Sequence, residues 1–374
     1  MRIALVHDFL TKLGGAEKVL QVLHTIYPDA PVYTLLYDKE GTRGIFEKDY
    51  KIITSSLQKK PAFIKKRQKL LLNSFPQAIE EFNFSDFDVV ISDSNSFAHG
   101  IITNPETLHI CYCYSPTRYL WDWHHEYLAE NQIDFGPVGR YIRSILSQIR
   151  IWDRLAADRV NVYISQSKTV AMRVKKYYRK DSAIINPPVD ISKFALSKAE
   201  PKDYYLIVSR LSPYKKIDLA ISAFNKLGKK LVIAGEGSDL NRLKSLATGS
   251  NIEFVGFVSD QKYLELLSNC KAFIFPGEED FGLTPVEAMA CGKPVIAYGR
   301  GGVTETSVAG ETGLFFAEPT AESLISAINE FEKDTSKFKP ETCRKRAEQF
   351  SEEIFVKKIK EAVDKSYKDF TINK

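Results

Sequence analysis

Three features that would narrow the function at once are missing from this 374-residue sequence. The five cysteines are odd in number and form no C-x-x-C pair, which argues against disulfides and a zinc site and favours a reducing compartment. No stretch approaches the roughly 20 apolar residues that span a bilayer, and the first apolar run is interrupted too early, by His7 and Asp8, for a signal peptide. We therefore expect a cytoplasmic protein.

A strong excess of one charge is also missing. The formal net charge is +5, which is too small to indicate a nucleic-acid partner by itself. With 44% hydrophobic and 26% charged residues, the composition is typical of a globular protein. A chain of 374 residues is long for one hydrophobic core, so its length predicts two domains.

Several enzyme motifs are incomplete. The glycines at 235–237 follow an apolar run, but Leu240 stands where a dinucleotide-binding G-x-G-x-x-G motif has its third glycine. Close approach to a ligand and simple turn geometry both remain open for these glycines. Asp86 and Asp88 match the D-x-D pattern of some metal-dependent sugar transferases, but they run straight into a predicted strand. We expect no metal site.

Short apolar runs alternate with helical patterns along the whole chain, which predicts parallel sheets covered by helices. One series of strands precedes residue 187 and a second follows residue 202, with a Pro-rich, charged linker between them. We predict an α/β protein of two Rossmann-like, doubly wound domains that face a cleft. The expected domains are 1–190 and 191–350, and the helical segment 351–374 is long enough to cross back to the first domain.

Two acids follow one of the predicted strands in FPGEEDFGLTPVEAMACGKPV, residues 275–295. Glu279 lies on a loop, and Glu287 lies eight positions later, inside a helix. Thr284 and Glu287 could form a capping box at the start of this helix. Capping does not explain the acids that cluster at 278–280, so a functional role for Glu279 stays open beside it.

Cations follow another predicted strand. Arg210 stands at the strand end and Lys215 five residues later, across a Ser-Pro turn. A guanidinium and an ammonium that converge suit a diphosphate, although two surface cations remain the alternative. Gly14 and Gly15 open a helix after the first strand, and a helix start favours an anion.

Together, the Glu279–Glu287 spacing, Arg210 with Lys215, and the Gly14–Gly15 loop resemble the retaining GT-B glycosyltransferases of family four. The segments VHDFLTKLGGAEKVL, CYCYSPTRYLWDW and INPPVD are most similar to bacterial mannosyltransferase-type members that build surface polysaccharides.

The resemblance implies a site for a nucleotide-sugar donor. Glu287 would bind the ribose and Glu279 the sugar, while the other donor-side residues would contact the phosphates or the base. The expected phosphate contacts are Gly14, Gly15, Arg210, Lys215, Gly282, Leu283 and Thr284, and those near the base are Gly256, Phe257 and Val258. Because the cations stabilise the departing diphosphate, the resemblance implies neither a metal nor another cofactor.

Relatives often carry a histidine near residue 114 that contacts the donor sugar. This sequence has Tyr114 there, so either Tyr114 or His99 would take that role, and His99 could equally be a structural residue. On the acceptor side the resemblance points to Arg118 and Asp122.

A basic segment at residues 57–72 gathers Lys65, Lys66, Arg67 and Lys69 around apolar residues. It predicts an amphipathic helix that either lies on anionic lipid or is an ordinary solvated surface helix. The first alternative would place the protein at the inner face of the membrane.

The sequence therefore favours a retaining, metal-independent transferase that moves a hexose, with mannose from GDP-mannose as the expected sugar, to a lipid-linked or polysaccharide acceptor. Alternatives are a UDP-sugar-dependent transferase, a GT-B epimerase, and a non-catalytic nucleotide-sugar-binding protein.

Overall fold

The computed structural model describes residues 1–196 and 200–372, apart from the side chain of Lys66. The chain divides into two compact units. Unit 1 comprises Met1–Pro188 and Phe355–Lys374, and unit 2 comprises Val189–Ile354. The domain boundaries predicted from the sequence fell at residues 190 and 350. Residues 197–199 of the predicted linker lie outside the described residues.

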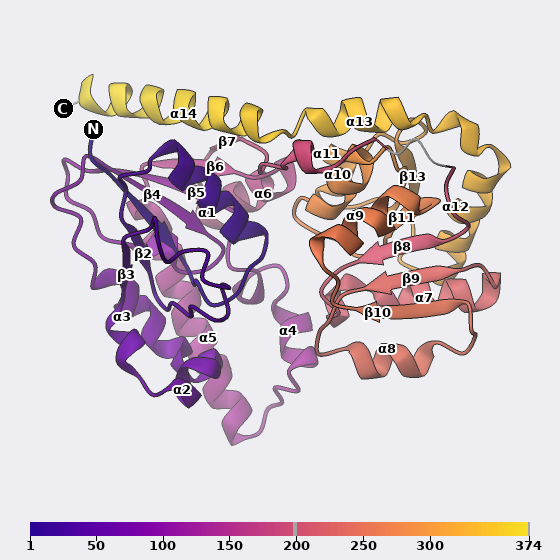
Figure 1. Ribbon diagram of the computed structural model, residues 1–374. Helices are drawn as coiled ribbons and strands as arrows, with labels where there is room; N and C mark the ends of the chain where they lie inside the picture. Colours follow the sequence, from indigo (N-terminus) through magenta and orange to yellow (C-terminus); the bar gives the residue numbers. More distant parts are fainter. Residues whose placement is uncertain (197–199, 373–374) are drawn as a thin grey trace. The chain divides into compact units, whose positions relative to one another are not determined.

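Unit 1 contains a parallel sheet of seven strands in the order β3-β2-β1-β4-β5-β6-β7 (Figure 1). Register is continuous through its centre, where Ile3–His7 pair with Val89–Asp93. The strands are β1 Ile3–His7, β2 Val32–Thr34, β3 Ile52–Thr54, β4 Val89–Ser94, β5 Leu108–Cys113, β6 Val162–Ser165 and β7 Ser182–Ile184.

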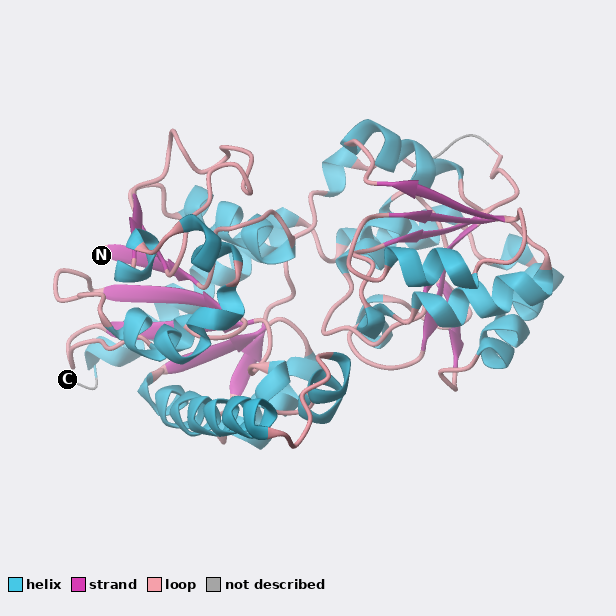
Figure 2. Ribbon diagram, turned by 90° about the horizontal axis from the view of Figure 1, so that it is seen from below, coloured by secondary structure: helices cyan, strands magenta, loops and turns pink. Residues whose placement is uncertain are grey.

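Side chains of successive strand residues point to opposite faces of this sheet. Ala4 and Val6 pack on one face, under α3 and α5, whereas Leu5 packs on the other face, under α1 and α14. Helices thus cover both faces, as expected for strands that are apolar throughout (Figure 2). The helices of unit 1 are α1 Gly15–Ile26, α2 Ala62–Lys66, α3 Phe75–Glu80, α4 His124–Glu130, α5 Pro137–Ala156 and α6 Lys168–Arg173, with most of α14 Glu352–Ile372.

The last helix, α14, completes the core of unit 1. Its buried residues Phe355, Ile359 and Val363 belong to the same apolar cluster as Leu20 and Leu23 of α1. The chain therefore leaves unit 1 after Pro188 and returns to it at Phe355.

Unit 2 contains a parallel sheet of six strands in the order β10-β9-β8-β11-β12-β13. Its strands are β8 Tyr205–Val208, β9 Leu231–Ala234, β10 Ile252–Gly256, β11 Ala272–Phe275, β12 Val295–Tyr298 and β13 Gly313–Phe316. Its helices are α7 Ile217–Leu227, α8 Leu240–Leu246, α9 Asp260–Asn269, α10 Leu283–Ala290, α11 Val303–Thr306, α12 Ala321–Lys333 and α13 Pro340–Glu348.

Two apolar layers enclose this second sheet. Ile207 and Ile274 face the layer formed with α7, α8 and α12, and Leu206 and Phe273 face the layer formed with α9, α10 and α13. The two sheets confirm the predicted fold class of an α/β protein with two doubly wound domains. The edge strands β3, β7 and β13 have only three or four residues each.

The prediction of one amphipathic helix at 57–72 is wrong. The segment forms a 3₁₀ turn, Ser56–Lys59, then α2, and then a second 3₁₀ stretch, Gln68–Ser74. Pro61 separates the first two, and Arg67, with φ −105° and ψ 61°, interrupts the helix after Lys66. The sequence pattern captured the amphipathic composition, but proline and the local backbone decided the geometry. In the described part of the chain, no helix is both long and apolar enough to cross a membrane.

Candidate active site

Both sheets reverse their strand order at one point, between β1 and β4 in unit 1 and between β8 and β11 in unit 2. Open α/β sheets bind ligands at the carboxyl ends of the strands that flank this point. Most of the residues predicted for the donor site follow one of these strands. The topology thus gives a common reason for their positions, and each unit can be described on its own.

In unit 2, Lys215 and Glu279 form an ion pair. Lys215 ends the short 3₁₀ turn Pro213–Lys215 after β8, and Glu279 lies on the loop between β11 and α10. The side-chain Nζ of Lys215 contacts Oε1 of Glu279, and the exposed fractions of the two side chains are 14% and 23%. The sequence predicted a phosphate-binding cation and a sugar-facing acid as separate contacts, whereas the structure joins them in one half-buried pair.

Arg210 is exposed and follows β8 directly. The loop that carries it is held by the glycines at 235 and 237. A Cβ atom at Gly235 would lie 1.9 Å from the carbonyl oxygen of Ser209, and one at Gly237 would lie 2.0 Å from that of Leu211. Close packing of two backbone loops therefore explains these glycines, which is neither of the two alternatives left open for them.

The predicted base-binding residues follow β10. Gly256 has a φ of +69°, which favours glycine, and its carbonyl oxygen accepts a hydrogen bond from the Gly235 N–H at 2.8 Å. Phe257 is 60% exposed, whereas Val258 packs against the core. The bend at Gly256 thus turns one apolar side chain outward and the next inward.

The start of helix α10 differs from the capping box that Thr284 and Glu287 could have formed. Gly282, with a φ of +88°, precedes the first helical residue Leu283, and no side chain of the described residues caps the helix. Thr284 is therefore already inside the helix and not its N-cap, so the capping box is wrong. The left-handed glycine turns the chain into the helix without using a side chain, and the amide groups of Leu283 and Thr284 lie in the first turn.

Glu287 is 5% exposed and accepts a hydrogen bond from the Tyr263 hydroxyl of α9. Burial, together with the charge of Glu287, holds the pKa of Tyr263 well above its usual range, so the phenol stays protonated and donates. Sequence reasoning missed Tyr263. Nothing in the sequence marks it, because the contact joins residues 24 positions apart on two helices.

The loop of Glu279 rests on a second glycine pair that the sequence analysis also missed. Gly301 bridges to Glu279, and the Gly302 N–H donates to the Glu279 carbonyl oxygen at 2.8 Å. A Cβ at Gly302 would lie 2.3 Å from Cα of Phe281. The Gly-Gly pair after β12 was a readable signal for such a close approach.

In unit 1, Gly14 and Gly15 open α1 as predicted from the sequence. Gly14 is the N-cap of α1, and no side chain of the described residues caps this helix either. A Cβ at Gly14 would lie 3.0 Å from Oε2 of Glu17. The glycine therefore lets the loop lie close to this buried carboxylate.

Below this loop lies a buried polar network that sequence reasoning missed. His7 Nδ1 lies 2.6 Å from Oδ1 of Asp93, and its Nε2 lies 3.6 Å from Oε1 of Glu17. The Tyr114 hydroxyl lies 3.2 Å from Oδ2 of Asp93 and 3.1 Å from the carbonyl oxygen of Ala16. The two strands that flank the reversal point carry this pair: His7 is the last residue of β1, and Asp93 is the second-last residue of β4.

Burial alone would lower the pKa of His7, but the charges and hydrogen bonds of Asp93 and Glu17 outweigh it and raise this pKa to about 10. Burial raises the pKa of Asp93 to about 6, against the opposing effect of His7. At neutral pH the pair is thus an imidazolium and a carboxylate. Because its hydroxyl lies within this network, Tyr114 holds the Gly14–Gly15 loop to the sheet.

Asp8 anchors the loop that follows β4. Its carboxylate accepts four backbone N–H bonds of 2.6–3.1 Å from the consecutive residues 95–98. These bonds satisfy a buried charge without a cation. The contact fixes the start of the segment that contains His99.

His99 is 3% exposed and lies inside unit 1. Its Nδ1 lies 3.4 Å from Oγ of Ser94, its Nε2 lies 3.3 Å from the Asp153 carbonyl oxygen, and its ring stacks on Tyr178. These contacts use both ring nitrogens and favour the structural alternative for His99.

The predicted acceptor residues Arg118 and Asp122 form an ion pair of 3.4 Å after β5. Arg173, which sequence reasoning did not name, contacts the same carboxylate at 3.1 Å. It comes from the end of α6, which follows the neighbouring strand β6. The spacing along the chain gave no signal for this third partner.

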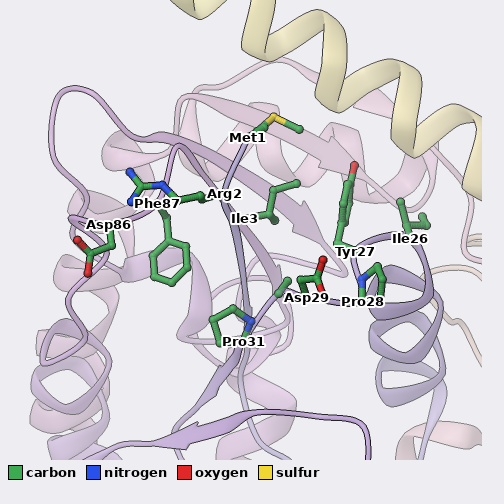
Figure 3. A pocket seen from close by; sticks show the side chains of 11 residues that line it. Met1, Arg2, Ile3, Ile26, Tyr27, Pro28, Asp29, Pro31, Asp86 and Phe87 are labelled. Carbon is green, nitrogen blue, oxygen red and sulfur yellow. The ribbon is translucent and has the colours of Figure 1, made fainter.

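The pocket shown in Figure 3 lies at the amino ends of the strands of the unit 1 sheet, away from their carboxyl ends. It measures about 530 Å³, and Ile3, Pro31 and Phe87, which line it, stand at or before the starts of β1, β2 and β4. Beside it, Asp88 accepts a 2.7 Å bond from the Arg2 N–H, which gives the D-x-D motif a structural role. Within residues 1–196 and 200–372, no three His, Cys, Asp or Glu side chains are grouped so as to hold a metal ion.

The comparisons with known proteins give a family match within unit 2. Residues 189–351 match the family described as glycosyl transferases group 1. The chain is 32% identical over 177 residues to the alpha-1,3/1,6-mannosyltransferase ALG2 of Dictyostelium discoideum. It is 34% identical over 161 residues to a GDP-mannose-dependent alpha-(1-6)-phosphatidylinositol dimannoside mannosyltransferase of Mycobacterium tuberculosis. These alignments cover 40% and 41% of this chain and 42% of each relative, so the chain spans less than half the length of these relatives.

Solved structures resemble the whole chain. Anabaena HepE in complex with UDP superposes with a TM-score of 0.70 at 18% identity, covering 98% of this chain and 100% of that one. Sucrose-phosphate synthase from Thermosynechococcus elongatus gives 0.74 at 16% identity, covering 99% and 100%. At these identities the similarity concerns the fold. Residues 189–351 therefore match the glycosyl transferases group 1 family, and the chain as a whole has the two-domain α/β fold of GT-B glycosyltransferases, as the resemblance in the sequence predicted.

Proposed function

We propose that this protein is a retaining glycosyltransferase that moves a hexose from a nucleoside-diphosphate sugar to a lipid-linked or polysaccharide acceptor. The Lys215–Glu279 pair, beside the exposed Arg210 and ahead of a helix start without a side-chain cap, carries the proposal. This arrangement stands at the strand-order reversal of the unit that matches the family.

The chemistry follows from where charge develops. As the bond from the anomeric carbon to the diphosphate oxygen breaks, the sugar gains positive charge and the diphosphate gains negative charge. Arg210, Lys215 and the first amides of α10 stabilise the leaving diphosphate. The acceptor hydroxyl oxygen bonds to the anomeric carbon on the same face, and its proton passes to the departing phosphate oxygen. This route needs no nucleophile from the protein.

The two acids then have different partners. Glu279 accepts hydrogen bonds from the hydroxyls of the sugar and keeps Lys215 oriented toward the diphosphate. Glu287, which Tyr263 holds in place, accepts hydrogen bonds from the ribose hydroxyls. Pre-ordered carboxylates of this kind bind hydroxyl pairs with little loss of side-chain entropy. The bend at Gly256 presents Phe257 toward the base.

We propose GDP-mannose as the donor because a mannosyltransferase described as GDP-mannose-dependent is among the relatives. A UDP-sugar is the second candidate, since HepE, which has the same fold, binds UDP. The acceptor is proposed from the same relative, whose substrate is a phosphatidylinositol mannoside.

Calorimetric titration of the protein with GDP, UDP and ADP, in a buffer without divalent metal, tests the proposal. We expect binding of GDP that weakens at least tenfold in Glu287→Gln and in Arg210→Ala. Lys230→Ala is the matched control, because Lys230 pairs with Glu253 on the surface of the same unit at 3.2 Å. A preference for UDP would indicate a UDP-sugar as the donor in place of GDP-mannose. If the protein bound none of the three nucleotides, the proposed donor site would be wrong.

Two other functions remain distinguishable by product analysis. A non-catalytic binding protein would bind the nucleotide-sugar but release neither free sugar nor a glycosylated product over long incubation. An epimerase would form a new sugar from the donor alone. Transfer to an acceptor extract, with release of the nucleoside diphosphate, is expected only of the transferase.

We also propose that unit 1 contacts anionic lipid. Phe63 and Leu70 of the basic segment are 66% and 65% exposed, and Phe135 and Val138 at the start of α5 are 76% and 72% exposed. The two segments are linked, because Lys69 Nζ donates to Oδ1 of Asn131 at 2.5 Å. Apolar side chains among cations suit an anionic bilayer surface, near which each cation contributes about 1 kcal/mol. The side chain of Lys66 lies outside the described part of the structure.

Sedimentation with vesicles of phosphatidylglycerol and phosphatidylcholine tests the membrane contact. We expect salt-sensitive binding to the anionic vesicles that weakens in Phe63→Ser with Leu70→Ser, and also in Lys65→Gln with Arg67→Gln. Ile151→Ser is the control, because Ile151 is 61% exposed on α5 at a distance in sequence from both segments. Equal binding of wild type and both pairs of variants would refute the contact.

A further inference from the structure

The pocket of Figure 3 lies apart from the candidate active site. It stands at the amino ends of β1, β2 and β4, whereas most residues of the candidate site follow the carboxyl ends of strands. Its volume of about 530 Å³ lies within the range of small-molecule sites. The proposed transfer reaction uses none of the residues that line this pocket, so the pocket is available to a different ligand.

Most of the pocket lining is apolar. Ile3, Pro31 and Phe87 stand at or just before the starts of three neighbouring strands and form an apolar floor. Tyr27, at the end of α1, adds a second aromatic ring. Ile3, Tyr27 and Phe87 are each partly exposed. Because covering exposed apolar surface is favourable, the pocket suits a ligand with an apolar body.

The charged side chains around this floor favour a cation. The two cationic groups of the pocket are already engaged, because Arg2 Nη2 lies 3.7 Å and the Met1 ammonium 3.9 Å from the Asp88 carboxylate. Asp29 and Asp86 also line the pocket and are exposed, and no ion pair of the described residues includes either of them. Figure 3 shows them on either side of the apolar floor. The pocket thus offers two carboxylates to a positively charged ligand.

Tyr27 provides a wall that can adjust to an occupant. Its hydroxyl is buried and has no hydrogen-bond partner among the described residues, and in Figure 3 it points toward helix α14. Most buried hydroxyls have a partner, whereas this ring is held by packing. The ring can therefore turn toward an occupant without breaking a hydrogen bond.

The ligand that fits this pocket combines a positive charge with an apolar body. Asp29 and Asp86 would repel an anion, and a cation without an apolar part would leave the floor uncovered. The rings of Tyr27 and Phe87 also attract cations. From this chemistry we propose that the pocket binds a small organic cation with an apolar body, such as an arylalkylamine. The proposal goes beyond the transferase function and does not depend on it.

Methyl NMR of the full chain tests this site. The three methionines, labelled with ¹³C at the methyl group, report on different places. Met1 lines the pocket, Met172 is 66% exposed on α6, and Met289 is buried on α10. Met172→Leu and Met289→Leu each remove one signal, which identifies the signal of Met1. The probes are phenethylamine, 3-phenylpropionate, which carries the same ring with a negative charge, and ethylamine, which carries the positive charge without the ring.

We expect phenethylamine to shift the Met1 signal saturably at millimolar concentration, while equal concentrations of the other two probes leave it unchanged. Asp29→Asn and Asp86→Asn should each weaken this binding about two- to fivefold, since an exposed charge pair contributes little, and together they should weaken it about tenfold. The matched control is Asp49→Asn, because Asp49 is an exposed acid of unit 1 that does not line the pocket.

Three results would overturn the site: phenethylamine does not move the Met1 signal, either of the other probes moves it as far, or the double variant of Asp29 and Asp86 binds phenethylamine as well as wild type. A parallel drift of the Met1 and Met172 signals without saturation would also reject it, because it would show general contact with the surface. Thermal unfolding of the double variant should match that of wild type, since both acids are exposed.

Discussion

Both units place charged residues at or after the carboxyl ends of the strands where the sheet order reverses, but the charges differ in their exposure. In unit 2, Lys215 and Glu279 remain 14% and 23% exposed. In unit 1, His7 and Asp93 are 3% and 1% exposed, and their partners are other side chains of the same unit. The same position in a fold thus carries a charged pair that stays partly accessible in one unit and a charged pair that is fully buried in the other.

This difference can be tested first by breaking the buried pair. His7→Leu should lower the free energy of unfolding by about 3–5 kcal/mol, because it leaves a buried carboxylate without its partner. Chemical denaturation measures the effect. His125→Leu, at an exposed position, is the control, and combining His7→Leu with Asp93→Leu should recover part of the loss. A loss below about 1 kcal/mol would mean that the network does not hold unit 1 together.

The partly buried Lys215–Glu279 pair of unit 2 should act on catalysis instead. Lys215→Ala should lower the rate of sugar transfer by about 100- to 1000-fold, since a donor aimed at developing charge is lost, and should change the unfolding free energy little. Initial rates with saturating donor, together with a denaturation curve, measure both. If stability falls and the transfer rate does not, Lys215 is structural and the contrast between the units fails.

The loop of Glu279 offers a sharper version of this test. Gly302→Ala forces a Cβ to within 2.3 Å of the Phe281 backbone, so the loop must shift, at a cost of about 1–3 kcal/mol. We expect weaker nucleotide binding by titration. Gly299→Ala is the control, because its Cβ would meet no atom closer than 3.3 Å. Equal nucleotide affinity in both variants would show that Glu279 does not depend on this support.

The last expected effect is a slope of stability with pH. The pKa of His7 is raised to about 10 in the folded chain, from a model-compound value of 6.5. Its stabilising contribution is therefore complete below pH 6.5 and is lost as the pH rises through about 10. The difference in unfolding free energy between wild type and His7→Leu should shrink over this window, by up to about 1.4 kcal/mol per pH unit. A constant difference from pH 7 to 10 would contradict a charged His7.

The sequence predicted what short-range patterns encode. Apolar runs located the main strands, and the Glu279–Glu287 spacing with Lys215 indicated the candidate site of unit 2. It could not reveal Tyr263 behind Glu287 or Asp93 beside His7, because these contacts form only when distant elements pack. The capping box and the single basic helix failed for a different reason. Gly282 and Pro61 impose local backbone geometry that outweighs a favourable side-chain pattern.

The return of the chain to unit 1 at Phe355 has a consequence for exchanging parts between relatives. Because α14 supplies Phe355, Ile359 and Val363 to the core of unit 1, unit 2 is an insertion within unit 1 and not its successor. A chimaera that replaced everything after residue 188 would combine one protein's first unit with another protein's closing helix. An internal cassette from Val189 to Ile354 leaves that core intact, so unit 2, with the proposed donor site, can be exchanged as a segment with two junctions.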